Sequence, residues 1–243
     1  MNMVSIEIKN LNKYYNKIQA VNNINFTINK GSIIGLLGPN GCGKTTTIGM
    51  MLGLIKPTSG KILINGEDIE TEKNRIKILQ KMNFISPYVE LPKKLTVEEN
   101  LKVYGKMYGV INLKDKISDL MNRLNLSEFK KRKTGELSSG QKNRVSLAKA
   151  LINDPEILLL DEPTASLDPD VGDYIRTYIE SFASKKGATI LLASHNMNEV
   201  ERLCSEVMMM KNGKIIDKGT CSSLINKHGR KNLEETFLKI VRE

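Results

Sequence analysis

One short stretch of the sequence combines glycines and a lysine at a spacing that suits phosphate binding. Residues 38–46 fit the pattern G-x-x-x-x-G-K-T. Glycines allow backbone angles that bring successive N–H groups close to phosphate oxygens. Lys44 adds a full positive charge for the outer phosphates, and the Thr45 hydroxyl can bind Mg2+. The stretch predicts a triphosphate site made of Gly38, Pro39, Asn40, Gly41, Cys42, Gly43, Lys44, Thr45 and Thr46.

The residues on either side of this loop supply the context that the motif requires. Residues 32–37 are a short apolar run that suits a buried strand, and residues 45–54 suit a helix. The N-terminus of a helix attracts phosphate because it carries unpaired N–H groups and the positive end of the helix dipole. An ordinary glycine turn is the alternative for the motif alone, and the strand–loop–helix order favours phosphate binding.

Two adjacent carboxylates follow a second apolar run. Residues 157–160 are Ile-Leu-Leu-Leu, and Asp161 and Glu162 come directly after them. Ligands of open α/β sheets bind beyond the carboxyl ends of the strands. Asp161 is therefore predicted to hold Mg2+ through its water shell, and Glu162 to polarise an attacking water. A lone acid at a strand end would indicate little, whereas the pair after a full apolar run is more specific.

A second phosphate-attracting element lies further back in the chain. Residues 137–141 read Leu-Ser-Ser-Gly-Gln and precede an amphipathic helix predicted over residues 142–152. Small residues at a helix N-terminus form an anion-binding surface. Because one chain needs only one phosphate loop, this element is predicted to serve a nucleotide held by another subunit. Its candidate residues are Ser138, Ser139, Gly140 and Gln141.

The order of these motifs resembles that of the nucleotide-binding domains of ATP-binding cassette (ABC) transporters. The chain follows that order over nearly its whole length. The glycine loop comes first, and after it come residues 137–141, the acidic strand end, residues 166–168 and Ser194-His195. The resemblance implies ATP hydrolysis with ATP and Mg2+. It also implies an α/β fold, a P-loop NTPase core with a mixed, mainly parallel sheet, an N-terminal antiparallel β subdomain and an inserted helical subdomain.

The resemblance also assigns roles to single residues. His195 corresponds to the histidine that senses the γ-phosphate and joins Lys44 and Glu162 as a catalytic candidate. Asp168 matches the loop that crosses the dimer interface. Tyr15 corresponds best to the aromatic residue that stacks on adenine. Tyr14 is the alternative, because strand alternation is expected to turn one of the two rings inward.

Three positions depart from the family pattern. Ser139 stands where the family usually has Gly, and the usual Gln near residues 83–87 is missing. Ser86, before Pro87, could offer a hydroxyl to Mg2+ or water, while Glu90 lies further along the chain. Cys42 is interpreted as a small residue that fits the phosphate loop. We expect the helix N-terminus and the Lys44 charge to lower its pKa and raise its reactivity.

The remaining patterns divide the chain into regions. Residues 4–11, 24–28, 61–64 and 189–193 are predicted strands, and Asn65-Gly66 and Asn212-Gly213 are turn signals. A capping box at Thr96 and Glu99 predicts a helix to about Tyr108, and a second helix is predicted over residues 112–125. A single ABC ATP-binding domain over residues 1–243 is expected, with its core at about 1–86 and 153–230, its helical subdomain at about 87–152 and a helical tail at about 231–243.

Composition narrows the possible partners. The chain of 243 residues has a net charge of +10, which fits an anionic membrane face or a lysine-rich proteome. Only 5% of its residues are aromatic and none is Trp, which disfavours stacking on nucleic acid, so no nucleic acid partner is expected. Its 3 scattered cysteines argue against structural zinc. No secretion signal or membrane-span pattern is visible, so a cytoplasmic location is expected.

The resemblance implies an ATP-hydrolysing subunit that lies on the inner face of the cell membrane and drives separate integral membrane subunits. A second copy, or a homologous cassette, would close with it on ATP. Residues 84–88, 95–101 and 233–238 resemble exporters of the ABC-2 type. Two alternatives stay open: a soluble, non-transport ABC ATPase, such as an assembly factor or a nucleic-acid-linked motor, and a weakly hydrolysing regulator. The cargo cannot be inferred, because a cassette does not touch it.

Overall fold

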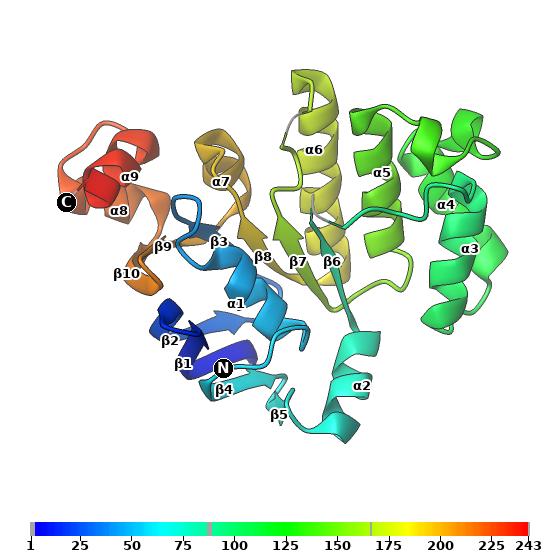
Figure 1. The fold of residues 1–243 in the computed structure, drawn as a ribbon. Coiled ribbons are helices and arrows are strands. Elements are labelled where there is room, and N and C mark those ends of the chain that lie inside the picture. Colours follow the sequence, from blue (N-terminus) through cyan, green and yellow to red (C-terminus); the bar gives the residue numbers. More distant parts are fainter. Residues whose placement is uncertain (1–2, 87–88, 166, 243) are drawn as a thin grey trace.

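The computed structural model describes residues 3–86, 89–165 and 167–242, which form two β-sheets flanked by helices (Figure 1). The smaller sheet is antiparallel and has the strand order β2-β1-β4-β5. Its strands are β1 (Val4–Tyr15), β2 (Ile18–Asn29), β4 (Ser59–Ile64) and β5 (Glu67–Asp68). This is the N-terminal antiparallel unit that the family resemblance implies.

The larger sheet has the order β10-β9-β3-β8-β7-β6. All neighbouring strands in it are parallel except β10, which pairs antiparallel with β9 at one edge. The predicted mixed, mainly parallel sheet is therefore confirmed. Its strands are β3 (Ile33–Leu37), β6 (Met82–Ile85), β7 (Ile157–Asp161), β8 (Thr189–Ala193), β9 (Glu206–Lys211) and β10 (Lys214–Gly219).

The helices lie between the sheets, over the larger sheet and beyond its two edges. α1 lies between the two sheets, α5 and α6 flank β7 and β6, and α3 and α4 stand beyond α5 (Figure 1). Two short 3-10 helices, Ser127–Phe129 and Thr134–Glu136, connect α4 to α5. The bounds are α1 (Lys44–Met51), α2 (Glu72–Gln80), α3 (Val97–Met107), α4 (Leu113–Arg123), α5 (Ser139–Ala150), α6 (Pro169–Lys186), α7 (Met197–Leu203), α8 (Cys221–His228) and α9 (Leu233–Arg242).

The larger sheet is buried on both faces, which explains its continuous apolar runs. Leu159 and Leu191 pack into a core shared with α1 and the smaller sheet. Leu158 and Leu160, the neighbours of Leu159, face the opposite core beneath the other helices. The prediction of buried strands at residues 157–161 and 189–193 is confirmed.

Local signals also set the ends of several elements. Asn65 and Asn212 have φ of 49° and 47°, and each is followed by a glycine with positive φ, as tight hairpin turns require. The Thr96 Oγ accepts from the Glu99 N–H at 3.2 Å, and the Glu99 carboxylate accepts from the Thr96 N–H at 2.8 Å. Both predicted turns and the predicted capping box are therefore confirmed.

Within the described residues, no helix combines the length and the apolar character that crossing a bilayer would take.

A buried cation ties the helical region to the larger sheet. Lys149, on α5, is only 7% exposed, and its Nζ donates to the Phe84 carbonyl of β6 at 2.9 Å. The ammonium lies 4.7 Å from the centre of the Phe84 ring and 5.7 Å from that of Tyr104 on α3. Burial lowers the pKa of Lys149 to about 8. One side chain therefore links α5, β6 and α3.

The lowered pKa predicts a stability that rises with pH. Between pH 8 and the ordinary lysine value of 10.5, the unfolded chain holds a proton at Lys149 that the folded chain releases. We expect the unfolding free energy of the wild type, measured in urea against Lys149→Met, to gain roughly 2 kcal/mol from pH 7.5 to pH 10. The titration of the other lysines and of the tyrosines contributes equally to both proteins and cancels in this difference. Parallel pH profiles of the two proteins would contradict the burial of the ammonium.

Candidate active site

Parallel strand pairing brings three distant motifs to one edge of the larger sheet. β8 lies between β3 and β7, with Ala193 paired to Leu36 on one side and to Asp161 on the other. The phosphate loop after β3, the acids at the end of β7 and Ser194-His195 after β8 therefore leave the sheet side by side. These are the strand ends at which open α/β sheets bind ligands.

Two glycines of the phosphate loop are required by close backbone contacts. Gly43 has φ of 112°, and a Cβ there would lie 2.5 Å from the Ala20 carbonyl oxygen of β2. A Cβ on Gly38 would lie 2.4 Å from the Met210 carbonyl oxygen of β9. Neither backbone neighbour can yield to a side chain. The loop is therefore held between the two sheets in a shape that only glycine permits at these positions.

The Lys44 ammonium lies inside this loop. Lys44 is 7% exposed, and its Nζ donates to the Gly38 carbonyl at 2.7 Å and to the Pro39 carbonyl at 3.2 Å. Carbonyl oxygens are weaker partners for an ammonium than phosphate oxygens, because they carry only partial charge. The lysine is thus preplaced for an anion that enters the loop.

Sequence reasoning missed a support beneath the loop. The Gly213 N–H donates to the Cys42 carbonyl at 3.0 Å, and the Gly213 carbonyl accepts from the Asn22 N–H at 2.8 Å. The Asn212-Gly213 pair predicted a hairpin turn, and that signal was correct. Nothing local indicates that the turn also connects the phosphate loop to β2, because this contact depends on the packing of the two sheets.

The expected lowering of the Cys42 pKa is wrong. The side chain is buried, with 4% exposure, and burial raises the pKa of its thiol. The Lys44 charge and backbone hydrogen bonds act in the opposite direction, but burial outweighs them. Sequence proximity to a lysine and a helix N-terminus did not reveal that the thiol points into the apolar core around α1.

A hydroxyl and a carboxylate meet where Mg2+ is expected. The Thr45 Oγ1 donates to the Asp161 Oδ2 at 3.0 Å, and Asp161 is 2% exposed. Burial raises the pKa of Asp161, and the Glu162 charge adds to this, whereas the Thr45 hydrogen bond and the Lys44 charge lower it. Mg2+ in phosphate sites takes one or two protein oxygens and completes its shell with water and phosphate. The two side chains fit that donor set.

Glu162 and His195 form a pair across the strand ends. The Glu162 Oε2 and the His195 Nδ1 lie 2.7 Å apart, and the Glu162 N–H donates to the Ala193 carbonyl at 2.8 Å. Glu162 has φ of 51°, a conformation that costs a non-glycine residue about 1 kcal/mol or more. The Glu162 side chain is 16% exposed and that of His195 is 68% exposed. A largely solvated imidazole is thus held against a shielded carboxylate.

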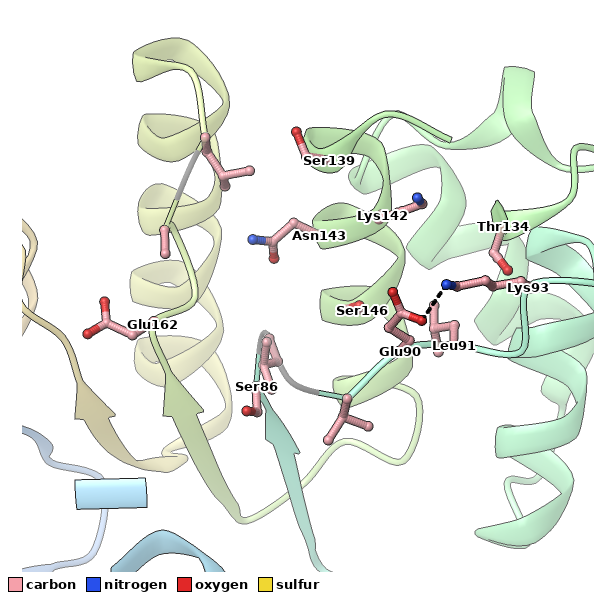
Figure 2. A pocket seen from close by; sticks show the side chains of 14 residues that line it. Ser86, Glu90, Leu91, Lys93, Thr134, Ser139, Lys142, Asn143, Ser146 and Glu162 are labelled. Atoms are coloured by element: carbon pink, nitrogen blue, oxygen red, sulfur yellow. Dashed lines mark ion pairs between the residues drawn. The ribbon is translucent and has the colours of Figure 1, made fainter. Parts of the chain in front are cut away.

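A cavity of about 270 Å3 opens beside Glu162 (Figure 2). Ser86, after β6, lines it together with Lys142 and Asn143 of α5. Glu90 also lines the cavity, and its carboxylate pairs with the Lys93 Nζ at 2.7 Å. Ser86 therefore borders the same space as Glu162, whereas Glu90 is engaged by a lysine. Pro87 and Tyr88, on which the predicted departure from the family pattern also rests, lie outside the described residues.

The second phosphate-attracting element is a capped helix N-terminus. α5 begins at Ser139, three residues before the predicted start. The Ser138 Oγ accepts from the Gln141 N–H at 3.3 Å, and the Gln141 Oε1 accepts from the Ser138 N–H at 3.0 Å. Because the Ser138 hydroxyl acts as an acceptor in this cap, its own proton stays available to a ligand. Ser138 and Ser139 are exposed, and Gly140 is partly buried.

This element is not joined to the phosphate loop within the chain. In Figure 1, β8, β7 and α6 stand between α1 and α5. Among the described residues, no hydrogen bond or ion pair connects residues 137–141 with residues 38–46. One chain thus brings Lys44, Thr45, Asp161, Glu162 and His195 together. The helix end at Ser138 stays unbonded to the phosphate loop, although its Ser139 lines the cavity beside Glu162.

The two remaining site candidates are exposed. Tyr14 and Tyr15 are each 44% exposed, so the expectation that one ring turns inward is wrong. A register shift between Lys13 and Tyr14 interrupts the strand alternation there. The Lys13 ammonium lies 4.9 Å from the Tyr15 ring centre. Asp168 precedes the first residue of α6, and Ser166 lies outside the described residues.

Comparison with known proteins identifies this arrangement. A family model described as "ABC transporter" matches residues 21–165. A Nod factor export ATP-binding protein from Rhizobium sp. (strain N33) is 36% identical over 230 residues, covering 94% of this chain and 75% of that protein. The chain belongs to the ABC transporter family. A bacitracin transport ATP-binding protein from Bacillus licheniformis is 40% identical over 232 residues, covering 94% of this chain and 74% of its own.

A solved structure supports both the fold and the chemistry of the cassette. A dimeric ATP-binding cassette in a post-hydrolysis state, bound to ADP and Pi, superposes with a TM-score of 0.83 at 27% identity. The match covers 88% of this chain and 98% of that one. The chain is thus an ATP-binding and ATP-hydrolysing subunit of an ABC transporter, with the P-loop NTPase fold that its motifs imply.

The burial of Cys42 predicts a slow thiol. We expect maleimide at pH 7.5 to modify Cys42 at least ~10-fold more slowly in the native cassette than in the urea-unfolded chain, because the thiolate is disfavoured and access is blocked. Peptide mass spectrometry would follow each of the cysteines separately. Native labelling as fast as in the unfolded chain would show instead that the loop exposes an activated thiol.

Proposed function

We propose that this cassette powers an exporter, using the closure of two cassettes on ATP to drive integral membrane subunits at the inner face of the cell membrane. The observation that carries the proposal is the meeting of the phosphate loop, the paired acids and His195 at adjacent strand ends, with the Ser138 helix end left apart. The export direction draws support from the Nod factor export relative. The transported substrate lies outside the proposal.

In this proposal, residues 38–46 hold the phosphates and Lys44 exchanges the Gly38 and Pro39 carbonyls for phosphate oxygens. Thr45 and Asp161 hold Mg2+, which when bound would neutralise charge on the phosphate oxygens. Glu162 orients and deprotonates the attacking water from the cavity side of the strand. His195, fixed against the Glu162 carboxylate at 2.7 Å, donates toward the γ-phosphate. Tyr15 stacks on the adenine.

The proposed second half of the site comes from another cassette. Ser138, Ser139, Gly140 and Gln141 present a helix N-terminus and hydroxyls to the ATP held by the partner, and Asp168 approaches the same interface. The support is geometric, because Ser138, Ser139 and Asp168 are exposed, and β8, β7 and α6 separate this helix end from the chain's own phosphate loop (Figure 1). A second copy of this chain or a homologous cassette would complete two sites head to tail.

The roles of Glu162 and Lys44 can be separated by binding and turnover. Glu162→Gln is expected to keep ATP affinity and to lower kcat on the order of 10²–10⁴-fold, because it removes the base while preserving shape. Lys44→Ala is expected to weaken ATP binding itself. Titration with a fluorescent ATP analogue and phosphate release would measure the two effects. Wild-type turnover by Glu162→Gln would overturn the role of Glu162.

Co-purification with a membrane protein is the decisive test of the transport proposal. Tagged Glu162→Gln cassette, purified with ATP from gently solubilised membranes of its own cells, is expected to carry a multi-span membrane protein in a fixed ratio. Lys44→Ala, purified in the same way, controls for ATP-independent adhesion. A soluble protein or nucleic acid in place of the membrane protein would contradict the transporter and favour an assembly factor or a motor.

A further inference from the structure

The loops that carry Glu162 and His195 rest on one buried carboxylate. Glu199, on α7, has 0% exposure. Its Oε1 accepts from the Thr164 hydroxyl at 2.8 Å, and its Oε2 accepts from the Ser194 hydroxyl at 2.6 Å. Thr164 lies two residues after Glu162, and Ser194 directly precedes His195. We propose that Glu199 is a positioning residue that locks the Glu162 loop and the His195 loop to each other.

The His195 loop is fixed on both sides of the histidine. The Ser194 Oγ, which donates to Glu199, also accepts from the Asn196 N–H at 3.1 Å. The Asn196 Oδ1 in turn accepts from the Glu199 N–H at 3.2 Å. Because the His195 side chain is 68% exposed, little packing holds the ring itself. Its position is therefore set by its two neighbours, and both of them are bonded to Glu199.

The Glu162 loop is fixed from the same carboxylate. A turn closes from the Ala165 N–H to the Glu162 carbonyl at 3.2 Å, so Thr164 lies within one turn of Glu162. The unfavourable φ of Glu162 makes this bend dependent on contacts that hold it. The Thr164 bond to a fully buried group is such a contact, because a buried hydrogen bond broken on one side leaves an unsatisfied polar group.

The link that Glu199 forms between the Glu162 loop and the His195 loop is the Glu199 bridge. It rests on the catalytic role proposed for Glu162, and it makes a kinetic prediction. Glu199→Ala is expected to lower kcat on the order of 10-fold or more while ATP affinity stays within about 2-fold, since the Glu199 carboxylate bonds Thr164 and Ser194 rather than residues of the phosphate loop. Glu199→Gln, whose amide can bond both hydroxyls, is expected to restore most of the turnover. The matched control is Glu201→Ala, because Glu201 lies on the same helix but is exposed, and within the described part of the chain its carboxylate accepts one hydrogen bond, from the Leu233 N–H.

A Glu162→Gln background separates positioning from general destabilisation. If Glu199 positions Glu162 and His195, Glu199→Ala should cost much less turnover in the Glu162→Gln background, because only the positioning of His195 is left to lose. An equal loss in both backgrounds, or a matching loss of ATP affinity, would mean that Glu199 only supports folding and would overturn the proposal. Glu199→Ala leaves a buried void and could prevent folding. Thr164→Val is a smaller change that removes only the Thr164–Glu199 hydrogen bond. It should reproduce the kcat loss if the Glu199→Ala variant does not fold.

A coupling measurement tests the bridge without relying on Glu162 as base. Thr164→Val and Ser194→Ala each break one end, so the kcat loss of the double variant should be smaller than the product of the two single losses. Independent losses would contradict the bridge. If Glu162→Gln proved fully active and the Thr164→Val and Ser194→Ala losses were still coupled, Glu162 would not be the base, but the Glu199 bridge would stand. If Glu162→Gln were inactive and the coupling absent, only the bridge would fail.

Discussion

The parallel pairing of β8 with both β3 and β7 is the constraint on which the site depends. Ala193 is paired on both sides, so the loops after three strands leave the sheet at one level. A slip of one residue in either pair would turn the strand side chains to the opposite core and separate the motifs. The two apolar cores, one on each face of the sheet, hold this register, and the phosphate loop, the acids and His195 follow from it.

Features encoded by neighbouring residues could be predicted from the sequence. The phosphate loop, the acids after a buried run, the Asn-Gly turns and the Thr96 capping box each depend on a few adjacent positions. Features that depend on packing could not be predicted. The Cys42 pKa is set by burial beneath α1, the inward turn expected of Tyr14 or Tyr15 fails at a register shift, and Glu199 looks like an ordinary acid in a first helical turn.

A single chain supplies only part of the proposed nucleotide site. The residues proposed to hold the phosphates from one side all lie at the strand ends, where the fold brings them together. The Ser138 helix end has hydroxyls and N–H groups of the right kind, yet the chain holds it across β7 and α6 from its own loop (Figure 1). In the proposed dimer, the anion that this helix end meets belongs to another cassette.

Turnover by mixed variants tests this shared site most directly. Lys44→Ala disables the phosphate loop, and Gly140→Asp places a negative charge toward the partner's phosphates. A Cβ added at Gly140 would lie 3.6 Å from its nearest neighbour, a Val171 methyl group, so the substitution starts without a clash. Each variant alone should be inactive. An equal mixture should recover roughly a quarter of wild-type turnover, since half the dimers would carry one intact site of two. A mixture as inactive as its parts would contradict the shared site.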